Sequence, residues 1–166
     1  MRFGDIKRRV VTCVLVSAML PAVPAMAAFD AYMTINGTKQ GRFKGEAMSE
    51  KIAVTSVSHD VKMASRMTTG RRQHGAITIR REIDAASPKL MQALSTNETL
   101  NDVTIVFHSS GAGAGKAAQT INLKNARIVA DRKAGGSELI TMEYDTIEVT
   151  WTDGGKTASD DWEAPN

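Results

Sequence analysis

Residues 75–90 read GAITIRREIDAASPKL, and this stretch decides the fold class. Its first half places Ile77, Ile79 and Ile83 at odd positions, with Arg80 and Glu82 facing out. This period of two is typical of a strand with one buried face. Its second half holds Ser87, a favoured N-cap, and Pro88, which suits the first position of a helix. The stretch therefore predicts a half-buried strand followed directly by a helix.

The helix that follows is predicted to be short. Leu90, Met91 and Leu94 fall on one of its faces, and it should end near Thr96. A helix of this length needs packing against other elements to persist in water. We therefore expect it to lie against a sheet.

Strand patterns occupy most of the remaining chain. Asn36-Gly37 predicts a turn after the first strand, a parity change predicts a bend near Ser56, and Gly135-Gly136 predicts a turn. Short strands with turn signals and one helix indicate an antiparallel sandwich or barrel with the helix on its side. The predicted strands are residues 32–36, 51–63, 76–83, 103–108, 119–130 and 138–151, and the predicted loops are 67–75 and 109–117.

The N-terminus has the pattern of a cleavable signal peptide. Lys7, Arg8 and Arg9 precede an apolar run at residues 10–20, which is shorter than the roughly 20 residues that span a bilayer. Ala25-Met26-Ala27 is an A-x-A cleavage site, so the mature chain should begin near Ala28. We predict a signal peptide at residues 1–27, one β-barrel-like domain at 28–153 and a tail at 154–166.

Charge and cysteine content narrow the classes of function. Residues 1–27 hold four of the 21 basic and one of the 18 acidic residues, which leaves 17 of each in the mature chain. A balanced mature chain gives no reason to expect nucleic-acid binding, and we expect no membrane association after signal cleavage. The single cysteine, Cys13, lies in the signal, so one hydrophobic core or oligomerisation must hold the mature protein.

The sequence lacks the recognised patterns of catalytic and cofactor sites. The glycine-rich stretch 110–117 resembles a phosphate-binding loop, but Ser110 stands at its first glycine and Ala117 at its magnesium-binding hydroxyl. His59, His74 and His108 have no metal-ligand spacing. We therefore expect neither enzyme activity nor a cofactor or metal.

Three stretches together resemble the Hcp family, the tube proteins of bacterial type VI secretion systems. The most specific is residues 70–90, in which His-Gly, an alternating strand, Asp84 and a Ser-Pro-x-Leu helix start follow in order. The others are the opening MTING at 33–37, followed by Gly41, and a third stretch from INLKNA at 121–126 through Glu138 and Glu143-Tyr144 to Ile147. The resemblance covers roughly residues 31–151.

The resemblance implies two packed antiparallel sheets that form a barrel-like sandwich, with one helix alongside. It also implies a homo-hexameric ring that stacks into a tube, with type VI spike and small effector proteins as further partners. Ring stacking in the family uses a long loop that matches residues 62–75 here, within a stretch from Lys62 to Arg81 that has no acidic residue. We expect a subunit or ring contact at Lys62, Arg66, Arg71, Arg72 and His74.

The predicted signal departs from the family, whose tube proteins are loaded from the cytoplasm without one. One explanation is a diverged member that works in the periplasm or outside the cell. Another is a translation start placed upstream of the true one. The alternative to a tube protein is an exported binding module that keeps the fold without forming a ring.

Overall fold

The computed structural model describes residues 30–63, 72–109 and 115–161. Twelve strands, one α-helix and two short 3-10 helices lie in these ranges. They are β1 (Asp30–Gly37), β2 (Gly41–Arg42), η1 (Glu46–Met48), β3 (Ile52–Val54), β4 (Ser56–Ser58), β5 (Val61–Met63), β6 (Arg72–His74), β7 (Ile77–Glu82), α1 (Ser87–Ser95), β8 (Leu100–His108), β9 (Ala117–Ala134), β10 (Ser137–Glu143), β11 (Thr146–Trp151), η2 (Thr152–Gly154) and β12 (Lys156–Asp161).

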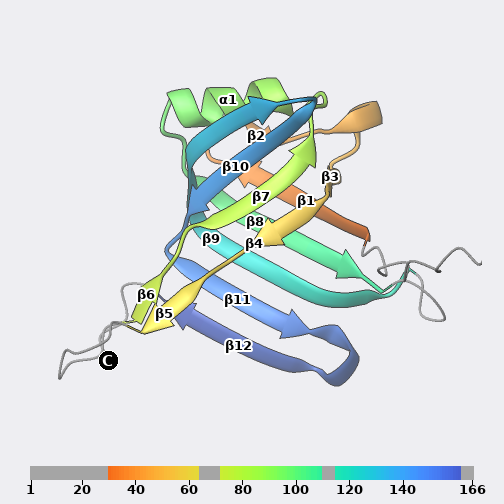
Figure 1. The fold of residues 1–166 in the computed structure, drawn as a ribbon, viewed down its shortest axis with the longest axis vertical. Helices are drawn as coiled ribbons and strands as arrows, with labels where there is room; N and C mark the ends of the chain where they lie inside the picture. The colour runs from red at the N-terminus through yellow and green to blue at the C-terminus, as the bar shows by residue number, and fades with distance from the viewer. Residues whose placement is uncertain (1–29, 64–71, 110–114, 162–166) are drawn as a thin grey trace, which may run out of the picture.

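Two antiparallel layers share the long strand β9. Up to Ala126, β9 pairs with β8, and part of this half also pairs with β11; from Arg127 onward it pairs with β10. Asn125 has a left-handed φ of 51° between the two halves, which marks where β9 passes from one layer to the other. The strand order runs β2-β1-β8-β9-β10-β7-β4. Its two ends do not pair within the described ranges, so the predicted sandwich is confirmed, with a barrel-like shape that stays open (Figure 1).

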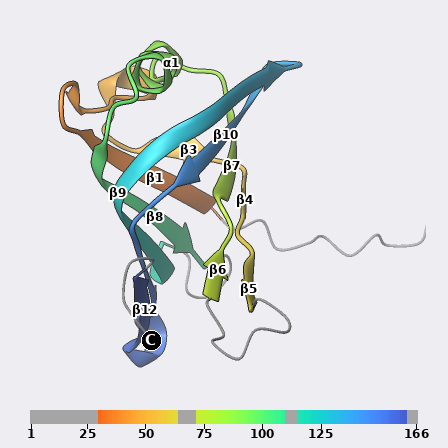
Figure 2. The same cartoon turned by 90° about the vertical axis from the view of Figure 1, so that its left-hand side faces the viewer.

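The core lies between the layers and beneath α1. Met33, Ile77, Leu123 and Ile140 come from four strands and are fully buried, and Leu90 of α1 joins them. In both ribbon views α1 lies across one end of the sandwich (Figures 1 and 2). The helix therefore persists by packing, as its short length requires.

The strand after Gly75 and its helix differ from the prediction in two positions. Ile77 and Ile79 are buried as expected, but the third inward position is Arg81, and Ile83 is 46% exposed because β7 ends before it. In α1, Leu90 and Ala93 are buried, whereas Met91 points to solvent. β7 therefore ends at Glu82, and the alternation of buried and exposed side chains ends with it.

Ser87 is not the N-cap that the sequence predicts. The Ala86 N–H donates to Asp84 Oδ1 at 2.7 Å, so the Asp84 side chain serves the start of α1. Ser87 instead donates its hydroxyl to the buried Glu138 carboxylate at 2.8 Å. The buried charge draws the hydroxyl away from the helix end.

Four segment boundaries also differ. Asn36-Gly37 lies in β1, and the turn follows at residues 38–40. Residues 72–74 of the expected loop form β6. The expected strand 138–151 is two strands, β10 and β11, because the chain changes layer near Tyr144 and the N–H of Asp145 bonds to the Lys124 carbonyl. Residues 156–161 of the expected tail form β12 against β11.

Candidate assembly interface

Three of the five predicted contact residues lie on the strands of one β-hairpin. Lys62 lies on β5, and Arg72 and His74 lie on β6; the two strands pair with Lys62 opposite Gln73. Arg66 and Arg71 fall in 64–71, outside the described residues. The backbone therefore brings three of the five predicted residues into one two-stranded ribbon.

This ribbon is a separate two-stranded sheet. Each of its strands has three residues, and neither pairs with a third strand within the described ranges. It lies at the opposite end of the molecule from α1 in both views (Figures 1 and 2). An isolated two-stranded hairpin is at best marginally stable in water, so this ribbon gains from a partner surface.

Two tight contacts fix the base of the ribbon. The N–H of Gly75 donates to the Asp60 carbonyl at 2.8 Å, and a β-carbon on Gly75 would come within 2.6 Å of that oxygen. His59 Nε2 and the Tyr144 hydroxyl share a hydrogen bond of 2.5 Å. Burial, with a smaller contribution from the Asp160 charge, raises the pKa of Tyr144 to about 12, so its hydroxyl stays protonated. The direction in which the ribbon leaves the body is therefore set by packed groups.

The outer face of the β1-β8-β9-β11-β12 layer carries mostly polar side chains. They alternate with the buried residues of each strand and line up across the strands in register. One such row is Thr34, Thr104, Asn122, Glu148 and Ser159. A broad and mostly polar face suits a solvated or assembled surface better than a reaction centre.

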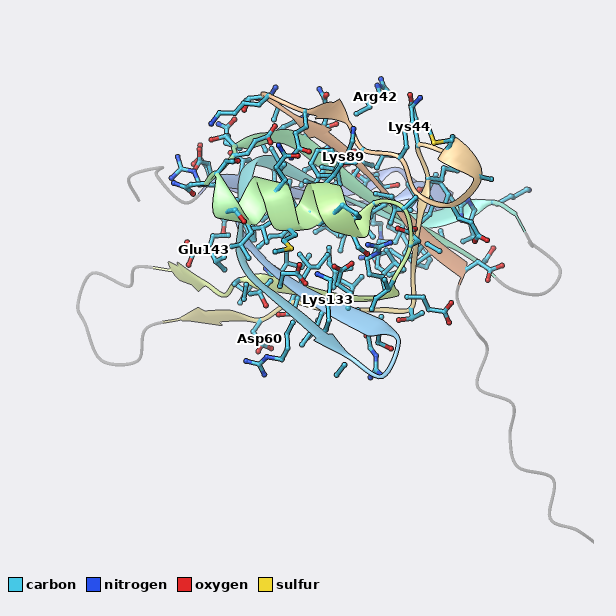
Figure 3. The ribbon with its side chains drawn as sticks, turned by 90° about the horizontal axis from the view of Figure 1, so that it is seen from above. Arg42, Lys44, Asp60, Lys89, Lys133 and Glu143 are labelled. Atoms are coloured by element: carbon cyan, nitrogen blue, oxygen red, sulfur yellow. The ribbon has the colours of Figure 1, made fainter. Side chains whose placement is uncertain are left out.

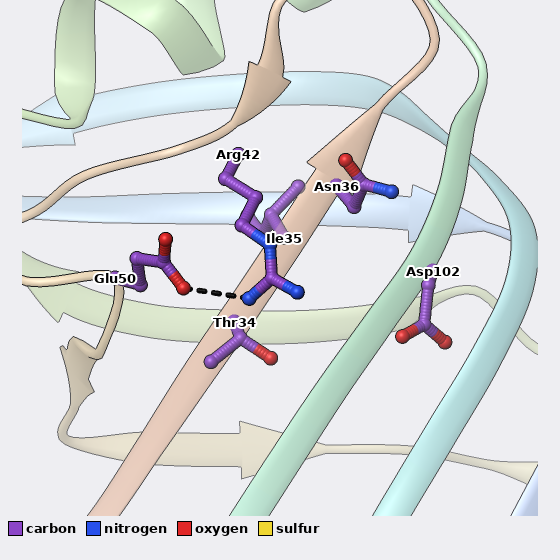
Figure 4. Close-up of a pocket in the computed structure, with 6 residues that line it drawn as sticks. All are labelled: Thr34, Ile35, Asn36, Arg42, Glu50 and Asp102. Atoms are coloured by element: carbon purple, nitrogen blue, oxygen red, sulfur yellow. Dashed lines mark hydrogen bonds and ion pairs between the residues drawn. The ribbon is translucent and has the colours of Figure 1, made fainter.

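A pocket on this face is lined mainly by polar and charged side chains (Figure 4). Thr34, Asn36 and Asp102 line it beside Arg42 and Glu50. Arg42 pairs with Glu50 at 2.6 Å, and Asp102 pairs with Lys124 at 2.7 Å outside the pocket. The charges are thus neutralised in pairs, and the pocket offers hydrogen-bonding groups without an activated nucleophile.

A buried charge cluster, which the sequence does not reveal, joins β7, β10 and α1. Arg81 and Glu138 are both fully buried and pair at 2.6 Å, while Arg81 also pairs with Asp84. Lys133 reaches Glu138 at 2.7 Å, lying across α1 from Lys89 in Figure 3. Burial opposes the charge of Lys133, but its bonds to Asp131 and Glu138 outweigh this and raise its pKa. The sequence gives one indication of this cluster, which is that Arg81 has the same parity as the buried Ile77 and Ile79 of β7.

Metal-ligating clusters and membrane-spanning helices are both absent from the described ranges. No group of three or more His, Cys, Asp or Glu could hold a metal ion there. Nor is any helix in those ranges long and apolar enough to cross a membrane.

Comparisons with known proteins agree on one family. The family model described as type VI secretion system effector, Hcp, matches residues 32–151. The "Major exported protein" of Pseudomonas aeruginosa is 31% identical, with 83% of this chain and 98% of that protein covered. The structure of secreted protein Hcp3 from the same species has a TM-score of 0.72 at 30% identity, covering 80% and 99% of the two chains. A crystal structure of an Hcp protein has a TM-score of 0.74 at 21% identity, covering 83% and 100%, and shows the shared fold.

Proposed function

The chain belongs to the Hcp family of type VI secretion proteins, and from this premise we propose that its mature part assembles into a homo-hexameric ring. The ring is a structural component or effector carrier of the secretion tube. The observation that carries the proposal is the isolated β5–β6 ribbon. It projects from the body, pairs with no third described strand and bears the acid-free basic stretch.

A ring of this kind needs a heterologous interface, in which one surface of each copy meets a different surface of the next. The ribbon supplies one such surface. The sequence from Lys62 to Arg81 has basic residues and no acidic one. Charge of a single sign attracts an oppositely charged partner surface and disfavours contact between two such stretches. Arg66, Arg71 and Arg72 are our candidates for the contact.

Light scattering on the chain beginning at Ala28 tests the ring. A mass six times that of the monomer, held over a range of concentrations, is the expected result. A monomer at every concentration would contradict the ring and favour an exported binding module with this fold. Spike and small effector proteins are the further partners that this proposal includes.

Export through the predicted signal is a second part of the proposal. The family model begins at residue 32, which leaves residues 1–27 outside the matched domain. We expect the full chain, expressed with its own N-terminus, to be recovered from the periplasm or medium with Ala28 first. N-terminal sequencing measures this, and an intact Met1 on cytoplasmic protein would support a misplaced translation start.

A further inference from the structure

We infer that a groove between η1–β3 and the end of β7 binds a basic, extended segment of another protein as an added β-strand. The groove has a volume of about 690 Å³. Its walls are formed by Glu46, Lys51 and Ala53 on one side and by Glu82, Ile83 and Ala85 on the other. We call it the seam groove, because β3 and β7 belong to the open ends of the two layers. The inference goes beyond the proposed ring and does not depend on it.

Two strand edges border the seam groove without a partner. β3 and β7 lie side by side (Figures 1 and 2), but β3 pairs with β1 alone among the described strands. β7 pairs with β4 only as far as Arg80, whose carbonyl also accepts a hydrogen bond from the Thr55 N–H at 2.9 Å. Beyond Arg80 no backbone hydrogen bond joins β7 to β3 within the described residues. Unpaired N–H and C=O groups on such edges are a template for an added strand.

A strand that bridges β3 and β7 must have both of its own edges free. Each of the twelve described strands already pairs with at least one neighbour, and β5 and β6 of the ribbon pair with each other. A described strand of a second copy would therefore have to leave its own sheet to fill the groove. This favours an extended segment of a different protein, which becomes ordered as it binds. The ribbon stays available for the ring contact proposed above.

Charge selects a basic donor segment. Glu46 and Glu82 are exposed on the two walls, and neither makes an ion pair with another described residue. Lys51 is the single basic residue among those that line the groove, and its ammonium group sits over the Tyr32 ring, 4.5 Å from the ring centre. The walls therefore carry two unpaired carboxylates, which lysine or arginine side chains of the donor would neutralise.

The groove also offers apolar contacts to a donor segment. Met48 at its rim is 68% exposed, and Ile83 on the opposite wall is 46% exposed. Ala47 and Met48 have positive φ values of 50° and 60°, a strained conformation that is more common at binding sites than elsewhere. The small side chains of Ala53 and Ala85 leave room for the donor backbone. The donor should therefore carry apolar as well as basic side chains.

A labelled peptide of alternating lysine and valine, TKVKVKT, tests the groove on the mature chain by fluorescence anisotropy. We expect it to bind about tenfold or more tightly than TEVEVET, which reverses the charge. We expect the same advantage over TKPKPKT, which keeps the charge but lacks two of the N–H groups that a strand donates. Absence of binding by TKVKVKT, or equal binding by either comparison peptide, would overturn the inference.

Two matched pairs of substitutions locate the site of peptide binding. We expect Glu46→Lys with Glu82→Lys to weaken binding of TKVKVKT by about tenfold or more, because like charges then face each other. Glu143→Lys with Glu148→Lys changes the net charge equally at exposed positions on β10 and β11 and should leave binding unchanged. Equal effects of the two pairs would overturn the inference.

Light scattering on the same proteins distinguishes a partner site from a contact between copies. We expect Glu46→Lys with Glu82→Lys to keep the mass of the unmodified mature chain. A loss of assembled mass would show that the groove joins copies of this chain and would overturn the inference. A hexamer that binds no peptide would overturn the groove and leave the ring. A monomer that binds the peptide in a groove-dependent way would overturn the ring and leave the groove.

Discussion

Gly37 and Glu98 fit together so closely that a β-carbon on residue 37 would overlap the carboxylate oxygen Oε1 of Glu98. That oxygen accepts hydrogen bonds from the N–H groups of Lys39, at 2.6 Å, and Gln40, at 2.8 Å. Glu98 is 1% exposed and follows α1 in the chain. The missing side chain at Gly37 therefore lets the carboxylate fasten the β1–β2 turn to the end of the helix.

A double-mutant cycle should expose this fit. We expect Gly37→Ala to lower the free energy of unfolding by about 2 kcal/mol through overpacking, and Glu98→Ala by about 3 kcal/mol through loss of hydrogen bonds to a charged group. The double variant should lose less than the sum, because removing the Glu98 carboxylate leaves room for the new methyl group on residue 37. Urea denaturation of the mature chain measures all three.

Gly154→Ala is the control for the cycle, since a β-carbon there comes no closer than 3.6 Å to Trp151. It should change stability little. Strict additivity of Gly37→Ala and Glu98→Ala would show that the two residues do not compete for space.

Acid stability should depend on Glu98. Burial opposes its ionisation, but hydrogen bonds from Gln40 and Lys39 outweigh this and lower the pKa of Glu98 below 4.5. The unfolded state then binds more protons, so the stabilisation is complete above pH 4.5 and is lost as the pH falls through the lowered folded-state pKa. Urea midpoints between pH 6 and pH 3, each ~1 unit apart, measure the slope.

Glu98→Gln is the matching variant for that series, because it keeps the size and removes the titration. We expect its stability to fall less steeply with decreasing pH than that of the unmodified protein. The slopes of stability against pH for the two proteins should differ only at acidic pH, where Glu98 takes up a proton. Identical slopes down to pH 3 would show that ionisation of Glu98 does not contribute to the loss of stability in acid.

The buried pair of Arg81 and Glu138 predicts a stability pattern of its own. Arg81→Met should cost about 3–5 kcal/mol, because the Glu138 carboxylate then loses a buried partner. Arg81→Met with Glu138→Leu should recover a large part of this loss, since well-packed apolar groups often replace a buried ion pair without cost. Thermal unfolding compares the two. A double variant no more stable than Arg81→Met would contradict the expected recovery.

These relationships mark the limit of what local sequence patterns can predict. Alternation at Ile77 and Ile79 fixes which face of β7 is buried, and the structure confirms it. The same parity makes Arg81 inward, but its partner Glu138 lies 57 residues away and the pairing exists only in the folded sheet. Likewise, Asn36-Gly37 has the residues of a turn, but Gly37 lies in a strand, where the Glu98 carboxylate occupies the space that a side chain would need. Contacts between remote residues leave no periodic signal.

Changes of layer leave an ambiguous signal in the sequence. The buried residues of 138–151 fall at even positions as far as Tyr144 and then at the odd position Ile147, and such a change of parity is equally typical of a bulge within one strand. Local alternation records which face is buried but not which sheet buries it. The hairpin residues could be proposed because the basic stretch is contiguous in sequence and matches a loop of the family by position.

Reversing the charges of the ribbon should weaken self-assembly. Arg66→Glu, Arg71→Glu and Arg72→Glu together place three acidic groups where the proposed contact needs basic ones, and like charges across an interface cost several kcal/mol. Sedimentation velocity of the mature chain should show a shift from the assembled species toward the monomer. Raising the salt concentration should weaken the unmodified assembly in the same direction, because exposed charges are screened.

The control for this reversal changes the charge equally at exposed positions away from the ribbon strands, with Lys116→Glu, Arg127→Glu and Lys156→Glu. It separates the effect of net charge from that of position. We expect the control to keep its assembled mass while the ribbon variant loses it, with both showing the same circular dichroism. If the ribbon variant kept the full assembled mass, its arginines would lie outside the contact, and the partner surface of the ring would have to be sought on the open sheet edges instead.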